Sequence, residues 1–275
     1  MGINDLLPYL RNKAPAAFSK FDAWKTLPKM RAAIDTPIFM YKFAYAVGTG
    51  KPLCARMLRF VNELHERDIE PIFVFDGGNL PEKVSEIRRR REAMQRASEL
   101  KDLRTNFKCG ALDYEVEKSS PSIRPIAEDY QALKYAMDSA GIETATAKFE
   151  AEALCSHLCR IGKVDFIITE DSDALAYLCP SVLLNWRNDK EEMVVIKQVC
   201  ETLQLSSEEF QDFCVLLGND FNSRIKGVGP VKAMELIKKH GSLEKLLELK
   251  VEMCSTSALA SQRLFRSTCY ENTSE

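Results

Sequence analysis

Three short apolar runs, each followed closely by an aspartate, constrain the fold of this 275-residue chain most strongly. The runs have the length and composition of buried strands and occupy residues 30–34, 69–75 and 164–169. The aspartates that follow them are Asp35, Asp76 and Asp171. Helical patterns separate the first two runs, which predicts an α/β fold with a mostly parallel central sheet flanked by helices. Parallel strands end at one edge, so the three aspartates are expected to lie together where open α/β sheets bind ligands.

Four more carboxylates are expected to join this edge from helix starts and loops: Glu150, Glu152, Asp173 and Asp220. The two glutamates stand at the beginning of a helix predicted over residues 151–161. Residues two apart on a helix diverge by about 200°, so both face one point only if Glu150 still lies in the extended entry to the helix. Acidic residues are also common in the first turns of helices, where the dipole favours them. That ordinary explanation would suffice for either acidic pair alone.

Crowded carboxylates repel one another unless a cation lies between them. No histidine accompanies the set, because His65, His157 and His240 lie elsewhere in the sequence. An all-oxygen cluster favours Mg²⁺ or Mn²⁺ over Zn²⁺. Seven carboxylates exceed what one Mg²⁺ needs and suit two ions, which can stabilise both the attacking and the leaving oxygen in phosphoryl transfer.

Basic residues complete the chemistry that such a site requires. Residues 81–108 predict a highly charged helix on which Lys83 and Arg90, seven apart, share one face. They could neutralise the charge that develops on a scissile phosphate. A solvated charged helix is the alternative, and it is preferred for Arg89, Arg91 and Arg96.

A glycine turn near the C-terminal end of the chain predicts a further phosphate contact. Gly227 and Gly229 open a helix in the manner of a helix–hairpin–helix, whose free N–H groups suit a DNA phosphate. Lys226 and Lys232 flank the turn, and their positive charges predict sequence-independent binding to the phosphates of duplex DNA. Tyr41, six residues after Asp35, could stack on a base, and a core tyrosine is an equally open interpretation.

Composition excludes several protein classes. The net charge of −2 does not by itself indicate nucleic-acid binding, although a metal site can conceal a basic surface. The nine cysteines, odd in number and scattered, indicate reduced thiols and an intracellular protein. No apolar run approaches the ~18 residues of a membrane span, and the first residues lack a secretory signal. No membrane association is expected, and the protein is expected in the nucleus if its source is eukaryotic.

The chain resembles the structure-specific 5′ nuclease family, which includes flap endonuclease, exonuclease and the xeroderma-pigmentosum-G nuclease. The matching segments follow the family's order over residues 1–245. They are Met1-Gly2-Ile3, Ala33-Ile34-Asp35, Val74-Phe75-Asp76-Gly77, Glu150-Ala151-Glu152-Ala153, Thr169-Glu170-Asp171-Ser172-Asp173, Leu217-Gly218-Asn219-Asp220 and Ile225-Lys226-Gly227-Val228-Gly229-Pro230. The segments around Asp76 and Asp171 are closer to the exonuclease branch.

The resemblance implies a PIN-like fold with a helical arch and a C-terminal helix–hairpin–helix, acting on branched or nicked duplex DNA with a 5′ single-stranded end. By motif, it implies that the seven carboxylates hold two Mg²⁺ or Mn²⁺ ions, directly or through water. Lys83 and Arg90 correspond to the basic pair of the gateway helix. Gly2 and Tyr41 correspond to positions that contact DNA. Backbone carbonyls of residues 223–228 correspond to a K⁺ site at the hairpin.

The expected organisation has five parts. An N-terminal nuclease region spans residues 1–108, with a basic gateway helix from about residue 81, and a mobile arch connection spans 109–128. An internal nuclease region at 129–220 completes the core, the helix–hairpin–helix spans 221–250, and a weakly ordered tail spans 251–275. Residues 262–265 do not complete a sliding-clamp peptide, which needs two aromatics, and a monomer is expected.

Three other functions remain as alternatives. A catalytically silent DNA-binding module of the same fold would have lost ligand carboxylates, and none of the seven is missing. A phosphatase with an aspartate nucleophile needs Asp-x-Asp after the first strand, whereas this chain has Asp35-Thr36-Pro37. A ribonuclease of related fold stays open, because acidic residues do not distinguish the two sugars.

Overall fold

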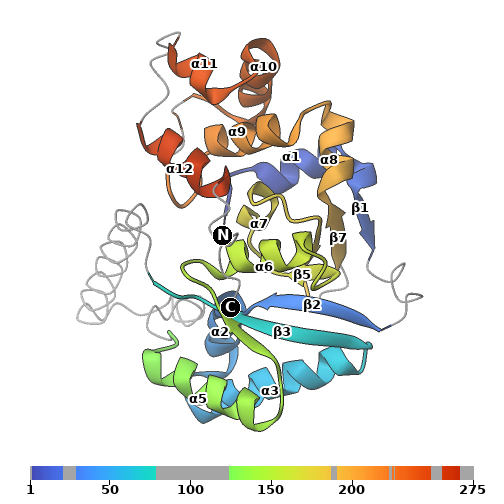
Figure 1. Ribbon diagram of the computed structural model, residues 1–275, viewed down its shortest axis with the longest axis vertical. Helices are drawn as coiled ribbons and strands as arrows, with labels where there is room; N and C mark the ends of the chain where they lie inside the picture. Colours follow the sequence, from blue (N-terminus) through green and yellow to red (C-terminus); the bar gives the residue numbers. More distant parts are fainter. Residues whose placement is uncertain are drawn as a thin grey trace, which may run out of the picture.

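The computed structural model describes residues 2–20, 29–78, 124–186, 191–222, 225, 227–248 and 256–266. Within these residues, seven strands form one sheet in the order β1-β7-β6-β5-β2-β3-β4 (Figure 1). The strands are β1 (Phe18–Lys20), β2 (Met30–Asp35), β3 (Ile69–Phe75), β4 (Thr144–Thr146), β5 (Phe166–Ile168), β6 (Ser181–Leu184) and β7 (Glu192–Val195).

The sheet is mostly parallel, as the sequence predicts. Strands β4, β3, β2, β5 and β6 run parallel to their neighbours, whereas β7 pairs antiparallel with both β6 and β1. Ile34 of β2 pairs with Phe73 of β3 and with Ile168 of β5. This register brings the carboxyl ends of the three strands to one edge.

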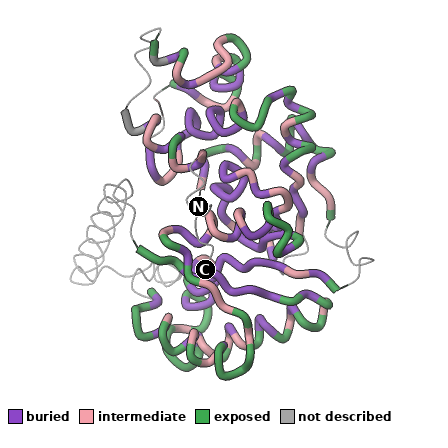
Figure 2. The backbone as a smooth tube through the Cα atoms, in the orientation of Figure 1, coloured by how far each residue is buried: buried purple, intermediate pink, exposed green. Residues whose placement is uncertain are grey.

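Helices cover both faces of the sheet, because successive apolar side chains of the central strands point to opposite faces and both faces must be buried. Ala33 and Val74 face a layer that contains α1 (Leu6–Lys13), α6 (Ala151–Arg160), α8 (Ile196–Leu203) and α9 (Ser207–Leu217). Ala32 and Phe73 face a second layer, made by α2 (Thr36–Val47), α3 (Lys51–His65) and α5 (Ala127–Ser139). The buried tube in Figure 2 follows the strands and the inner sides of both layers.

The remaining helices contribute buried residues to the same core as the first layer. They are η1 (Pro15–Ala17), α7 (Asp173–Ala176), α10 (Pro230–His240), α11 (Leu243–Glu248) and α12 (Thr256–Arg266). Helices α10 and α12 pack on α9, and α11 packs on α10 (Figure 1). None of the described helices combines the length and the apolar character needed to cross a membrane.

Three elements differ from or add to the sequence-based expectations. Within the tail expected over 251–275, residues Thr256–Arg266 form helix α12, whose Ala258 and Phe265 are buried against the core; the rest of the tail lies outside the described residues. Strand β7 ends at Val195, and helix α8, which was not predicted, begins at the next residue, Ile196. The short strand β1 was not predicted, because its three residues carry no alternating pattern.

Candidate active site at the carboxyl edge of the sheet

Asp35 ends strand β2 and lies at the centre of the acidic edge. It is 1% exposed, and its Oδ2 accepts a 2.6 Å hydrogen bond from Thr169 Oγ1 at the end of β5. Burial raises the pKa of Asp35 to about 8; the hydrogen bond from Thr169 opposes this shift, and the charges of Asp76 and Asp171 add to it. The three strand-end aspartates are therefore close enough to act on one another electrostatically.

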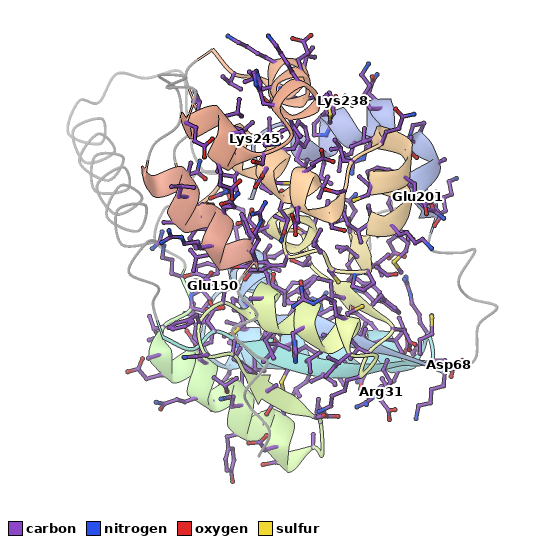
Figure 3. The ribbon with its side chains drawn as sticks, turned by 45° about the horizontal axis from the view of Figure 1, so that its top comes forward. Arg31, Asp68, Glu150, Glu201, Lys238 and Lys245 are labelled. Atoms are coloured by element: carbon purple, nitrogen blue, oxygen red, sulfur yellow. The ribbon has the colours of Figure 1, made fainter. Side chains whose placement is uncertain are left out.

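Asp76 is tied to the beginning of helix α6. Its Oδ1 accepts a 2.9 Å hydrogen bond from the N–H of Ala151, the first residue of that helix. Glu150 has the extended backbone that both glutamates require to face one point (φ −87°, ψ 135°). Glu152 follows in the first turn, and its charge, with those of Asp35 and Asp76, adds to the effect of burial in raising the pKa of the Cys155 thiol. Figure 3 shows Glu150 near this edge and Arg31 near the opposite edge.

The loop after β3 approaches the loop before α6 so closely that Gly77 is required. A Cβ atom at Gly77 would lie 2.0 Å from the carbonyl oxygen of Ala147. The N–H of Gly77 donates a 2.7 Å hydrogen bond to Phe149 O. This backbone pairing holds Asp76 and Glu150 on neighbouring loops.

The N-terminal residues pass directly beside Asp171. Gly2 has φ +96°, and a Cβ atom there would lie 2.2 Å from Asp171 Oδ1. The N–H of Ile3 donates a 2.8 Å hydrogen bond to Ser172 Oγ. Asp171 Oδ1 in turn accepts a 3.0 Å hydrogen bond from the N–H of Asp173, the first residue of α7. Gly2 and Ile3 are therefore part of this edge.

The loop that carries Asp220 is connected to the same segment. The N–H of Asn4 donates a 3.3 Å hydrogen bond to Gly218 O. Within the loop, Asn219 Oδ1 accepts hydrogen bonds from the N–H groups of Phe221 (2.9 Å) and Asn222 (3.2 Å), which lie on the far side of Asp220. Asp220 thus occupies a constrained turn that follows α9.

The chemistry of the edge suits a hard divalent cation. Its candidate ligands are carboxylate oxygens. Burial is the main cause of the raised pKa of Asp35, the charges of Asp76 and Asp171 add to the shift, and a bound cation would offset that repulsion. Among the described residues, no three His, Cys, Asp or Glu side chains lie close enough together to hold a metal ion. The acidic side chains instead accept hydrogen bonds from nearby N–H and O–H groups, as Asp35, Asp76 and Asp171 do.

The sequence did not predict two contacts near this edge of the sheet. Lys42 forms an ion pair with Glu170, which joins α2 to the loop that carries Asp171. Burial raises the pKa of the Tyr130 hydroxyl, and charge on Tyr41 and Asp76 adds to the shift. The Tyr130 ring of α5 lies 6.5 Å from the ring of Phe75, the residue before Asp76, measured between centroids. Tyr41 itself is 41% exposed on α2, unlike a core tyrosine. No local pattern identifies Tyr130, because its neighbours come from distant segments.

The glycine turn before α10 has the geometry of a helix entry. Gly227 has φ +80°, and Gly229 is the N-cap of α10. The side chain of Lys232 is exposed in the first turn. Figure 3 shows Lys238 and Lys245 on α10 and α11, away from the sheet. Lys83, Arg90 and Lys226 lie outside the described residues, as does most of the 109–128 connection.

Comparison with known proteins identifies the family. Family models for the XPG N-terminal domain and the XPG I-region match residues 1–97 and 141–220, and these two regions contain all seven carboxylates. The chain is 33% identical over 270 residues to the Flap endonuclease 1 of Debaryomyces hansenii, an alignment that covers 90% of this chain and 69% of that protein. The chain belongs to the structure-specific 5′ nuclease family. It is a nuclease, a hydrolase that acts on DNA, and the family is metal-dependent.

Solved structures of similar fold agree with the PIN-like architecture of this nuclease. The catalytic core of Rad2 in complex with DNA substrate has a TM-score of 0.67 at 24% identity, covering 96% of this chain and 79% of that chain. The Holliday junction-resolving enzyme GEN1, in complex with product DNA and a Mg²⁺ ion, has a TM-score of 0.55 at 21% identity. That alignment covers 85% of this chain and 49% of GEN1. At these identities the likeness concerns the fold alone.

Proposed function

We propose that this nuclease hydrolyses DNA phosphodiester bonds near the junction of a 5′ single strand and a duplex, with two Mg²⁺ or Mn²⁺ ions bound at the carboxyl edge of the sheet. The observation that carries the proposal is the parallel register of β2, β3 and β5, whose carboxyl ends, with Asp35, Asp76 and Asp171 at or just beyond them, meet at that edge. Branched or nicked duplex DNA with a 5′ single-stranded end is the substrate class that fits the family.

Seven acidic residues would hold the two ions, directly or through water: Asp35, Asp76, Glu150, Glu152, Asp171, Asp173 and Asp220. When bound, the ions supply an activated water and stabilise the leaving oxygen. Thr169 and the N–H of Ala151 orient the carboxylates of Asp35 and Asp76, respectively. Lys83 and Arg90 stabilise the charge that develops on the scissile phosphate.

DNA contacts are proposed on both sides of this edge. Gly2 lies so close to Asp171 that a Cβ atom would collide with that carboxylate, and its backbone is the proposed DNA contact at this end of the site. The exposed Tyr41 ring offers a surface on which a base stacks. At the hairpin, Gly227 and Gly229 present N–H groups to a duplex phosphate, and Lys226 and Lys232 add positive charge. A K⁺ ion held by backbone carbonyls of residues 223–228 belongs to the same proposal.

The organisation of the protein follows from these contacts. We assign residues 1–108 and 129–220 to the nuclease core, 109–128 to the arch connection and 221–250 to the helix–hairpin–helix. We expect the protein to act as a monomer and, if its source is eukaryotic, in the nucleus during replication, repair or recombination.

Cleavage of matched substrates tests the proposal. A 5′ flap, a nicked duplex, a blunt duplex and a matching RNA are incubated with the protein in Mg²⁺ or in EDTA, and product ends are mapped. We expect cuts at the single-strand/duplex junction of the flap and next to the 5′ end at the nick, each leaving a 5′-phosphate, and no cuts in EDTA. Binding without cleavage in Mg²⁺ and Mn²⁺ would support the silent DNA-binding module, and preferential cutting of RNA would support a ribonuclease.

A further inference from the structure

Helix α12 contacts the loop that carries Asp220. Ser261, which is 0% exposed, lies opposite Asn219. Asn219 Nδ2 donates a 2.8 Å hydrogen bond to Ser261 Oγ, and Ser261 Oγ lies 3.0 Å from Asn219 Oδ1. The Asn219 amide is therefore held by two contacts from α12.

The same amide shapes the backbone around Asp220. Asn219 Oδ1 accepts the N–H groups of Phe221 and Asn222, so the side chain bridges both sides of Asp220. An amide can rotate about its terminal torsion, which is broad. The Ser261 hydroxyl contacts both amide atoms and restricts that rotation, while the N–H groups of Phe221 and Asn222 keep Oδ1 directed at the loop.

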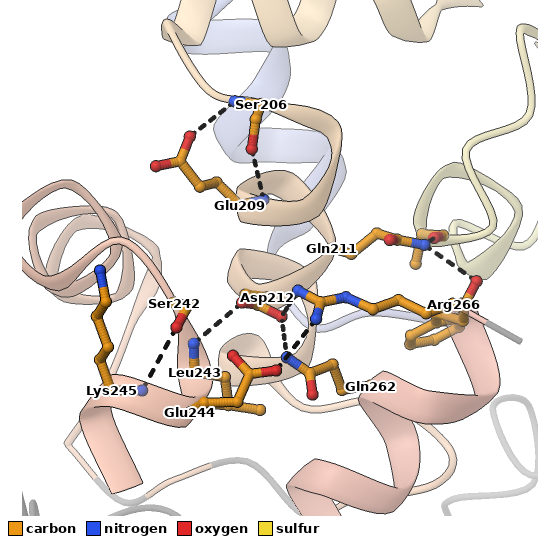
Figure 4. Close-up of polar contacts among 12 residues, drawn as sticks. Ser206, Glu209, Gln211, Asp212, Ser242, Leu243, Glu244, Lys245, Gln262 and Arg266 are labelled. Atoms are coloured by element: carbon orange, nitrogen blue, oxygen red, sulfur yellow. Dashed lines mark hydrogen bonds and ion pairs between the residues drawn. The ribbon is translucent and has the colours of Figure 1, made fainter. Parts of the chain in front are cut away.

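Helix α12 is itself anchored on a buried carboxylate of α9 (Figure 4). Asp212, which is 0% exposed, accepts hydrogen bonds from Gln262 Nε2 (2.6 Å) and from an Arg266 guanidinium nitrogen (2.9 Å) through Oδ1. Its Oδ2 accepts the N–H of Leu243, the first residue of α11, at 3.0 Å. Arg266 also pairs with Glu244 at 3.1 Å. One carboxylate thus joins α9, α11 and α12.

A second anchor connects α12 to helix α7. Gln211 Nε2 donates to Phe265 O of α12 (3.0 Å) and to Ala176 O at the end of α7 (2.9 Å). The Phe265 ring packs 4.9 Å from Tyr177 and 5.8 Å from Phe221, measured between ring centroids. Helix α7 begins at Asp173, so α12 contacts the segments that bear two of the proposed metal ligands.

We propose that α12 is a positioning element of the active site, in which Ser261 holds Asn219 so that Asp220 keeps its place at the metal-binding edge. The proposal rests on the proposed function, because it treats Asp220 as a ligand. Ser261 touches neither substrate nor ion, and it acts through the Asn219 amide. The hydrogen bonds from Gln262 and Arg266 to Asp212 hold α12 in place, so Ser261 stays within hydrogen-bonding distance of the Asn219 amide.

The test measures Mn²⁺ binding by electron paramagnetic resonance, without DNA, in the wild type and in Ser261→Ala. Loss of a group that orients a metal ligand costs about tenfold or more in metal affinity. We expect Mn²⁺ binding to weaken about tenfold and the Mg²⁺ concentration for half-maximal cleavage to rise by a similar factor. A purely structural role would reduce the active fraction without moving either value. Ser261→Thr, which restores a hydroxyl, should recover most of the affinity.

Two further variants keep the test decisive. Arg263→Ala alters an exposed residue on the same helix and should leave Mn²⁺ binding unchanged. Arg266→Gln loosens α12 from Asp212 without altering the Asp220 loop, so it decides the question if Ser261→Ala does not fold. If Ser261→Ala folds and binds Mn²⁺ with wild-type affinity, this inference is overturned and the proposed function is not. If Ser261→Ala does not fold, wild-type Mn²⁺ affinity in Arg266→Gln has the same consequence. A wild-type protein that neither binds Mn²⁺ nor cleaves DNA would instead overturn the proposed function.

Discussion

Thr169 Oγ1 donates a 2.6 Å hydrogen bond to Asp35 Oδ2 and accepts a 3.0 Å hydrogen bond from the N–H of Asp171. One buried hydroxyl thus joins the ends of β2 and β5 and orders two of the acidic residues. Thr169→Val keeps the shape of the side chain and removes both bonds. We expect a loss of about 1–3 kcal/mol in the free energy of unfolding, because buried polar groups are left without partners. Urea unfolding measures this loss of stability, and Thr146→Val, at an exposed threonine, is the control. Equal stability of the two variants would contradict this reading of the edge.

The contact between Gly2 and Asp171 predicts a specific effect on cleavage. Gly2→Ala places a Cβ atom within 2.2 Å of Asp171 Oδ1, so the carboxylate or the N-terminal segment must shift. Displacing a catalytic group by about 1 Å can cost about 100-fold in rate, and we expect a loss of that order. Gly162→Ala is the matched control, because Gly162 also has positive φ (+71°) but a Cβ atom there meets nothing within 4 Å. If both variants cleaved DNA equally well, Gly2 would have no special place at this edge.

The raised pKa of Asp35 predicts how stability responds to pH when divalent ions are removed. The folded-state pKa is about 8 against an ordinary value of 3.8, mainly because of burial. The stabilising contribution of the protonated carboxyl is complete below the ordinary pKa and is lost as pH rises toward about 8. In EDTA, the melting temperature should therefore fall as pH rises through this window.

Asp35→Asn has no charge to lose and isolates the effect of this residue. As pH rises through this window, the melting temperature of Asp35→Asn should fall by at least about 3 °C less than that of the wild type. For a chain of this size, that difference corresponds to about 1 kcal/mol in the free energy of unfolding. The exposed Asp138→Asn should keep the wild-type profile. Thermal unfolding monitored by circular dichroism at several pH values makes the comparison. An Asp35→Asn profile as steep as that of the wild type would show that other groups govern the response.

The exposed Lys232 at the beginning of α10 predicts a change in the salt dependence of duplex binding. Lys232→Gln should weaken binding to all sequences alike and lower the slope of log affinity against log salt by about one, as expected for one lost phosphate contact. Fluorescence anisotropy in EDTA measures binding without cleavage. Lys197→Gln on α8, where Lys197 pairs with Glu201, is the control. An unchanged slope would remove Lys232 from the duplex contact.

Sequence reasoning predicted the parts of the fold that follow from local patterns. The apolar runs ending at Asp35, Asp76 and Asp171 are strands whose ends meet at one edge, because a parallel sheet forces them there. The extended backbone at Glu150 also follows from geometry, since both glutamates of that motif can face one point only in this way.

The elements that were missed depend on partners far away in the chain. The last 25 residues are Ser/Thr-rich and weakly patterned, which indicated a tail, yet Gln262 and Arg266 of α12 both bind Asp212, at least 50 residues earlier. Tyr130 is near the acidic edge only because α5 packs beside strand β3, next to Phe75. Periodicity records which face of an element is buried, and it does not record which distant residue that face meets.

Cleavage of a 5′ flap by Asp76→Asn and Asp171→Asn tests the central claim most directly. Asparagine keeps the hydrogen-bond acceptors for the N–H groups of Ala151 and Asp173 and removes only the charge. Glu170→Gln, which removes a neighbouring charge paired with Lys42, is the control. We predict that both aspartate variants bind the flap as the wild type does and lose nearly all Mg²⁺-dependent cleavage, while Glu170→Gln retains it. Wild-type cleavage by either aspartate variant would contradict the account.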